Sequence, residues 1–200
     1  MVAVAWKPQG LPEEDWFRAS LYGFLGGLLG AAPDEGTVRS LRAMPGDGTP
    51  IGSALRDIAS AAALPVSTIQ KEYDVLFIGL TGGQVVPFAS YYLSGFLFEK
   101  PLAALRSDLV RLGIEAGERS ADPEDHIAFL FEVMQGLILG AFGEPADLQS
   151  QKQFFDAHIG SWADRLFADL EAAPAAVFYR PVARAGSLLL SIEMDAFAMA

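Results

Sequence analysis

Apolar residues recur at helical spacing along nearly the whole chain. The pattern is clear at positions 17–29 and again at 102–112, where steps of three and four residues separate the apolar positions. Such steps place apolar side chains on one face of an α-helix. No run alternates apolar and polar residues over the length of a strand, and the β-branched pair Val85-Val86 is too short to form one. The pattern predicts an all-α protein, a single bundle-like domain over residues 1–200 with roughly eight to ten helices.

Local signals predict where helices begin. Pro12 followed by acidic residues at 13–15 suits a helix N-terminus, because proline lacks the unbonded N–H and the helix dipole favours negative charge there. Ser67 with Gln70 has the spacing of a capping box. We therefore expect helices to start just after Pro12 and at Ser67.

Composition limits the compartment and the chemistry. Cysteine is absent, which excludes disulfides and thiol catalysis and is compatible with a reducing cytoplasm. The apolar run at 19–33 follows three acidic residues and is too short to span a bilayer, so we interpret it as a buried helix rather than a signal peptide. We expect a soluble cytoplasmic protein without stable membrane insertion.

The chain is strongly acidic, with 14 Lys and Arg against 25 Asp and Glu and a net charge of −11. Such a surface repels nucleic acid and anionic membranes and attracts cationic partners. The same charge also keeps an apolar protein soluble. Both interpretations stand at this point.

Motifs for catalysis or cofactor binding are missing. His126 and His158 are the two histidines, too few for a zinc site without cysteine. Neither the nucleophile elbow of hydrolases nor the phosphate-binding loop of NTPases occurs, and Gly79–Gly83 carries no basic residue. We predict no catalytic residue, no metal ligand and no cofactor.

The segment Gly79–Tyr92 interrupts the helical pattern. One interpretation is a connection stiffened by Pro87 and anchored by Phe88 and Tyr92. The other is a binding loop, because connections of about a dozen residues are enriched at functional sites. An apolar, partly aromatic surface of this kind suits a peptide.

Asp125 and His126 lie at the expected start of a helix and form a second candidate site. Asp122 is the expected N-cap of the helix, which makes Asp125 its third residue and His126 the next. Asp125 then completes a capping box, whereas a cationic histidine is disfavoured there by the helix dipole. A neutral His126 in a cleft is the functional alternative.

These residues resemble the TorD/DmsD family of chaperones for molybdenum-containing redox enzymes. The resemblance covers residues 73–200. It is tightest in four stretches and a fifth further downstream: Leu76-Phe77-x-Gly79, Pro87-x-x-Ser90-x-Tyr92, Leu97-Phe98…Leu105-Arg106, Pro123-Glu-Asp-His126, and His158-x-x-x-Trp162. Two departures are Phe88, where the family often has Trp, and Ser161, where it often has Pro.

The resemblance implies a cytoplasmic all-α chaperone, with a larger N-terminal part and a smaller C-terminal part joined by a hinge near residues 143–162. Such proteins bind the twin-arginine signal peptide of an apo-molybdoenzyme and delay its export until the cofactor is inserted. The family's peptide-binding positions fall on Leu76, Phe77, Gly79, Pro87, Phe88, Ser90, Tyr92, Asp125 and His126. The protein is a monomer or a domain-swapped homodimer, and the peptide binds extended or helical.

Two other functions remain open on the sequence. Asp125 and His126 would act as an acid–base pair in a small-molecule enzyme. A permanent accessory subunit of an oxidoreductase would use the same apolar surface for assembly. Nucleotide binding has been proposed for the family, but this chain has no motif for it.

Overall fold

The computed structural model describes residues 7, 10–79, 82–114 and 123–199. Over these residues the chain is helical and contains no strand, which confirms the all-α prediction. The elements are α1 Glu13–Gly30, α2 Glu35–Arg42, α3 Pro50–Ala61, α4 Val66–Tyr73, the π-helix η1 Asp74–Ile78, α5 Ala89–Ser94, α6 Lys100–Arg111, α7 Ile127–Leu139, α8 Leu148–His158, α9 Ala163–Ala172 and α10 Tyr179–Ala198. No described helix combines the length and the hydropathy needed to cross a bilayer.

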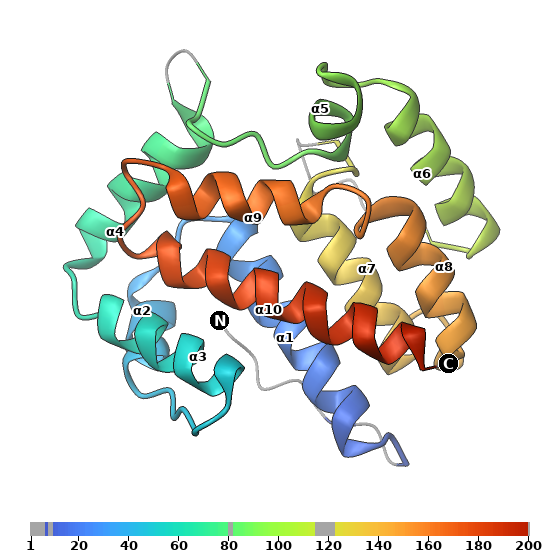
Figure 1. Cartoon of the computed structure of the whole chain (residues 1–200), viewed down its shortest axis with the longest axis horizontal. Coiled ribbons are helices and arrows are strands. Elements are labelled where there is room, and N and C mark those ends of the chain that lie inside the picture. The colour runs from blue at the N-terminus through green and yellow to red at the C-terminus, as the bar shows by residue number, and fades with distance from the viewer. Residues whose placement is uncertain (1–6, 8–9, 80–81, 115–122, 200) are drawn as a thin grey trace.

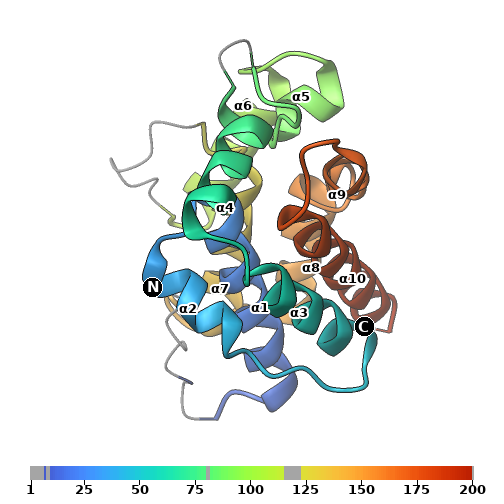
Figure 2. The ribbon, with the colours of Figure 1, turned by 90° about the vertical axis from the view of Figure 1, so that its left-hand side faces the viewer.

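The long helices α1, α7 and α10 form the centre of the molecule. α1 packs along α7, and α10 packs against α9, α3 and α1. Figure 1 shows α2 and α3 at one end and α5 and α6 at the other, with α9 and α10 crossing in front of α1. The turned view in Figure 2 places α5 and α6 at the top of the molecule. This arrangement leaves the α5–α6 hairpin at the periphery.

Small residues allow the central helices to approach closely. A Cβ added to Gly26 of α1 would lie 3.3 Å from the carbonyl oxygen of Ala128 in α7. On α10, a Cβ at Gly186 would overlap the ring of Phe167 from α9. Glycine inside a helix costs about 1 kcal/mol relative to alanine. Here it makes room for the backbone and ring of the neighbouring helices, where the core is densely packed.

One buried polar cluster joins α1, α8 and α10. The guanidinium of Arg18 donates to both carboxylate oxygens of Glu193, at 2.6 and 2.7 Å, and to Gln151 at 3.0 Å. The Tyr22 hydroxyl also donates to Glu193, at 3.1 Å. Glu193 is fully buried. The charge is tolerated because each carboxylate oxygen accepts hydrogen bonds.

Glu72 joins α4 to the start of α10. Its carboxylate accepts from the backbone N–H groups of Val177 (2.8 Å), Phe178 (3.1 Å) and Tyr179 (2.8 Å). These amides precede or begin α10 and have no partner within the helix itself. The side chain of a distant residue therefore caps α10.

The two predicted helix starts had different outcomes. α1 begins directly after Pro12, with its acidic first turn, as expected. α4 begins at Val66, its N-cap is Pro65 and no side chain caps it, so the Ser67 capping box is wrong. The N-cap is thus Pro65, two residues before Ser67, and its fixed φ suits the entry into the helix.

Two turns interrupt the range 143–162, one before α8 and one between α8 and α9. Side chains from both sides of this range, including Ile138 and Leu166, share one core. A hinge there stays a prediction.

Candidate functional site

The loop after η1 folds back onto that helix. Gly79 ends the π-helix with its N–H bonded to the carbonyl of Asp74 at 2.8 Å and a φ of 44°, a value that favours glycine. Val85 N–H then donates to Leu76 O at 2.9 Å. Gly83 lies so close to the Leu76 and Phe77 backbone that a Cβ would overlap it. The loop is thus fixed by backbone contacts, and π-helical segments of this kind are often found at functional sites.

The same loop pairs with the segment before α7. Phe88 and His126 form an isolated antiparallel bridge, with Ala89 N–H donating to Asp125 O at 3.0 Å and Ile127 N–H to Pro87 O at 2.9 Å. The rings of Phe88 and His126 meet edge to face, 4.9 Å apart. The two segments singled out in the sequence therefore lie side by side.

The carboxylate of Asp125 caps α5. Its Oδ2 accepts from Ser90 N–H at 2.8 Å, and the residue is 1% exposed. Oδ1 of Asp125 and Oγ of Ser90 are buried and have no hydrogen-bond partner among the described residues. Asp125 therefore serves the start of a neighbouring helix, which its position in the sequence did not suggest.

His126 is the N-cap of α7. Its Nδ1 accepts from Ala128 N–H at 3.1 Å, so this nitrogen carries no proton. The helix begins at Ile127, and the prediction that Asp125 and His126 lie within its first turn is wrong. The predicted N-cap Asp122 lies outside the described residues. A histidine ring takes the role expected of a shorter polar side chain.

Most of the predicted peptide-binding residues are buried and support the local structure rather than form its surface. Five are buried: Leu76, Pro87, Ser90, Asp125 and His126. Four are partly exposed: Phe77, Gly79, Phe88 and Tyr92. The buried ones hold the loop and the helix starts in place, and the partly exposed ones border the surface above them.

Tyr92 ties α5 to α9. Its ring stacks on Trp162 with 5.4 Å between centroids, and its hydroxyl donates to Asp169 at 2.9 Å. Burial, followed by the hydrogen bond to Asp169, raises the pKa of the Tyr92 hydroxyl well above its usual value. The hydroxyl is a permanent donor in this contact.

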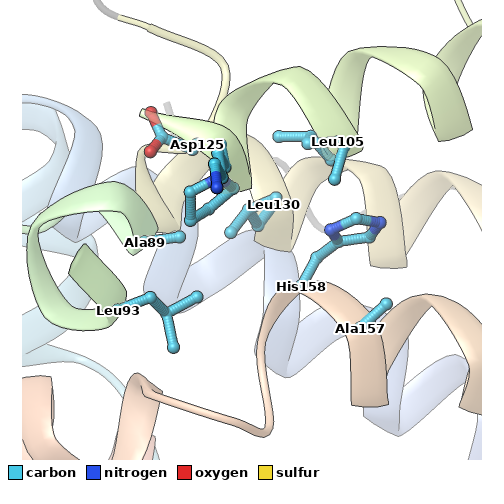
Figure 3. Close-up of a pocket in the computed structure, with 10 residues that line it drawn as sticks. Ala89, Leu93, Leu105, Asp125, Leu130, Ala157 and His158 are labelled. Atoms are coloured by element: carbon cyan, nitrogen blue, oxygen red, sulfur yellow. The ribbon is translucent and has the colours of Figure 1, made fainter. Parts of the chain in front are cut away.

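A cavity of about 240 Å³ lies beneath α6. Its walls are mainly apolar and come from α5, α6, α7 and α8, as Figure 3 shows for Ala89, Leu93, Leu105, Leu130 and Ala157, with Asp125 and His158 among them. A hydrogen bond of 2.8 Å joins His158 Nε2 to Asp108 of α6. Beside the cavity, Arg106 of α6 makes a two-pronged contact with Glu124. α6 is thus tied to the body by a charged contact on each side.

Exposed apolar residues beside this cavity were not among the predicted ones. They are Tyr91, Leu93, Phe96, Leu97 and Phe98. The sequence signal for them is the run Phe96-Leu97-Phe98 between Gly95 and Pro101, which fits no helical stripe. The sequence alone does not show whether such an apolar run in a loop is buried or exposed, because that depends on its packing partners.

Within the described ranges, no three histidine or carboxylate side chains gather closely enough to hold a metal ion. The cavity under α6 is lined by one carboxylate, one histidine and Lys100, and the histidine is bonded to Asp108. The arrangement offers apolar surface, aromatic edges and acidic groups. Those features suit recognition of a peptide better than bond-breaking chemistry.

Comparisons with known proteins identify the family and the fold of the chain. The profile of the family described as "Nitrate reductase delta subunit" matches residues 45–168. A crystal structure from Archaeoglobus fulgidus, provisionally assigned as a redox enzyme maturation protein, has the same fold, with a TM-score of 0.59, 22% identity, and 87% of this chain and 93% of that chain covered. No curated protein sequence matches. The chain belongs to the TorD-like nitrate reductase delta subunit family.

Proposed function

We propose that this protein binds the twin-arginine signal peptide of an apo-molybdoenzyme in the cytoplasm and delays export until the cofactor is inserted. The family match and the fold shared with a protein provisionally assigned as a redox enzyme maturation protein support a role in maturation. The signal peptide, the molybdoenzyme and the timing of export are the parts that we propose.

The observation that carries the proposal is the paired loop. Backbone hydrogen bonds connect Leu76 to Val85 and Pro87 to Ile127, and the Phe88 ring packs on His126. The family-implied positions from the two segments therefore belong to one rigid unit. A rigid surface lowers the ordering cost of binding a flexible peptide.

Charge supports the same partner. A twin-arginine peptide presents two fixed positive charges followed by an apolar stretch. The chain has a net charge of −11, and Glu124 and Asp125 lie at the paired loop. Complementary charge speeds association and orients the peptide more than it adds affinity. Apolar contact has to supply most of the binding free energy.

A micromolar or somewhat tighter complex is expected. Apolar burial contributes about 25 cal/mol per Å², and ordering a disordered peptide takes back about 2–5 kcal/mol or more. A complex of that strength releases its client when the mature protein folds. Permanent assembly would need a larger and tighter interface.

The proposal is tested in cells that make a molybdoenzyme with and without its signal peptide. A tagged form of this protein should retain the apo-enzyme carrying the signal peptide and release it once the cofactor is supplied. Equal retention of both enzyme forms would show that the signal peptide is not recognised. Stoichiometric association with the mature enzyme would instead identify an accessory subunit.

The acid–base alternative has no supporting contact. Asp125 Oδ2 and His126 Nδ1 each accept a backbone N–H, and both residues are buried. An acid–base pair has to reach the substrate's proton within hydrogen-bond distance. The geometry therefore favours the peptide-binding proposal.

A further inference from the structure

The hairpin of α5 and α6, residues 89–114, is here named the α5–α6 arm. It contains seven of the fourteen large apolar side chains that are exposed among the described residues: Tyr91, Leu93, Phe96, Leu97, Phe98, Val110 and Leu112. The arm occupies the top of the molecule in Figure 2. Exposed apolar surface concentrated in this way marks an interaction site.

Five of these residues form what we call the 91–98 ridge: Tyr91, Leu93, Phe96, Leu97 and Phe98. Phe96 and Phe98 are each 71% exposed. Phe98 has a φ of 62°, and within the described ranges it is the sole non-glycine residue with a positive φ. A bulky residue in the left-handed region is strained by about 1–3 kcal/mol. The backbone therefore holds an aromatic ring toward solvent at a cost.

The arm differs in charge from the rest of the protein. Residues 89–114 contain three cations (Lys100, Arg106 and Arg111) and two carboxylates (Glu99 and Asp108). The net charge of the arm is therefore +1, and the remaining chain carries −12. A near-neutral apolar surface thus adjoins an acidic one. The complementary ligand is a segment with an uncharged apolar stretch and a cationic end.

The ridge continues into the cavity under α6. Leu93 belongs to both, and the other cavity walls include Ala89, Pro101 and Leu130. At the base of the arm Glu124 is paired with Arg106 and Asp125 is buried, and the negative charge beyond it belongs to the remaining chain with its net −12. Apolar surface and negative charge therefore follow one another along the molecule.

We propose that the 91–98 ridge is the docking surface for the apolar stretch of the signal peptide, with one apolar side chain in the cavity and the arginines toward the acidic remainder of the chain. This inference rests on the proposed function. It adds a surface outside the nine family-implied positions. It also gives those positions a different task, because most of them hold the arm rather than touch the peptide.

The test uses two synthetic peptides that share a pair of arginines. In one the arginines precede an uncharged stretch of leucine and alanine, and in the other this stretch is replaced by serine and glycine. Each is titrated into the full-length protein, into a Phe96→Ser/Phe98→Ser variant and into a control, Val177→Ser, in which another exposed apolar side chain (57% exposed) is removed elsewhere. All three substitutions lie at exposed positions, so the fold should be retained.

The wild-type protein should bind the apolar peptide at least roughly tenfold more tightly than the serine–glycine peptide. The Phe96→Ser/Phe98→Ser variant should lose most of that difference, and Val177→Ser should keep it. Unchanged affinity of the double variant for the apolar peptide would overturn the inference and leave the proposed function intact. Failure of the wild-type protein to bind either peptide would contradict the proposed function itself.

Two further measurements exclude other occupants of the ridge. Sedimentation of the wild-type protein and the double variant reports a second copy, and flotation with phosphatidylglycerol–phosphatidylethanolamine vesicles reports a lipid surface. We expect the double variant to match the wild type in both. A change from dimer to monomer, or a loss of vesicle binding, with peptide affinity unchanged would overturn the inference.

Discussion

Phe88 and His126 form an antiparallel bridge and place their rings edge to face at 4.9 Å. The pairing brings the start of α5 and the start of α7 together, and the segment before α7 supplies the caps for both helices. Asp125 caps α5, and His126 caps α7. The start of α5 therefore depends on a segment 35 residues away in the chain, whereas α7 is capped by its own N-cap residue.

Substitution of Asp125 separates its capping role from its charge. Asp125→Asn keeps an oxygen that accepts from Ser90 N–H, whereas Asp125→Ala leaves this buried amide without its partner. We expect Asp125→Ala to lose about 1–3 kcal/mol of unfolding free energy and Asp125→Asn clearly less. Both should weaken binding of an arginine-containing peptide. Urea unfolding and calorimetry together measure the two effects, and equal stability losses would contradict the capping role.

His126 can be replaced by another N-cap residue. Asparagine is among the preferred N-caps, and alanine is among the poorest. His126→Ala should cost about 0.5–2 kcal/mol of unfolding free energy. His126→Asn should recover a measurable part of that loss while removing the ring contact with Phe88. Because both variants lack the ring, an asparagine variant that unfolds no later than the alanine variant would contradict the capping role of His126.

The helical architecture could be predicted because apolar periodicity is local. Proline and acidic residues likewise fixed the start of α1 at Glu13. The start of α7 was missed because a histidine ring, rather than Asp122, supplies the cap next to Ile127. Histidine ranks low among capping residues, so sequence statistics favour the aspartate.

Long-range contacts were beyond sequence reasoning. Glu72 caps α10 from a hundred residues away in the chain, and Asp125 caps α5 from the α7 side. The exposure of Phe96 and Phe98 depends on where the arm packs, and the left-handed backbone of Phe98 has no local signal such as glycine. The sequence indicated which segments interrupt the helical pattern, but not which residues face solvent.

The buried ion pair of Arg18 and Glu193 should dominate the stability of the α1–α10 contact. Arg18→Leu leaves a fully buried carboxylate without its cation and should cost about 3–5 kcal/mol of unfolding free energy. The double substitution Arg18→Leu/Glu193→Leu removes the stranded charge and should recover much of the loss. Urea unfolding of both variants measures this. A single variant within about 1 kcal/mol of wild type would show that the pair contributes little.

Acid should weaken the ties of α6. The hydrogen bond from Arg106 lowers the pKa of Glu124 below its usual value of 4.5. For Asp108, burial acts to raise the pKa, but hydrogen bonds from Arg111 and His158 outweigh it and the net pKa falls below 3.8. Depressed folded-state pKa values stabilise the fold above the unfolded pKa, and this contribution is lost as pH falls through the folded values.

Glu124→Gln therefore should lower the unfolding free energy at pH 7 and have progressively less effect as the pH falls below 4.5. Arg106→Gln should show the same trend, and the double variant should add little to either single one, because both remove one contact. Chemical unfolding across this pH range measures the difference. An effect of Glu124→Gln that stays constant down to pH 3 would mean that the ionised contact is not its source.

The most direct test of the central claim is calorimetric titration of the purified protein with the twin-arginine signal peptides of its host's molybdoenzymes. We predict saturable binding of at least one peptide at micromolar or tighter concentration, weakened when both arginines are replaced by glutamine and when the apolar stretch is replaced by serine and glycine. Absence of binding heat for every such peptide, at two temperatures to exclude a compensating zero enthalpy, would contradict the account.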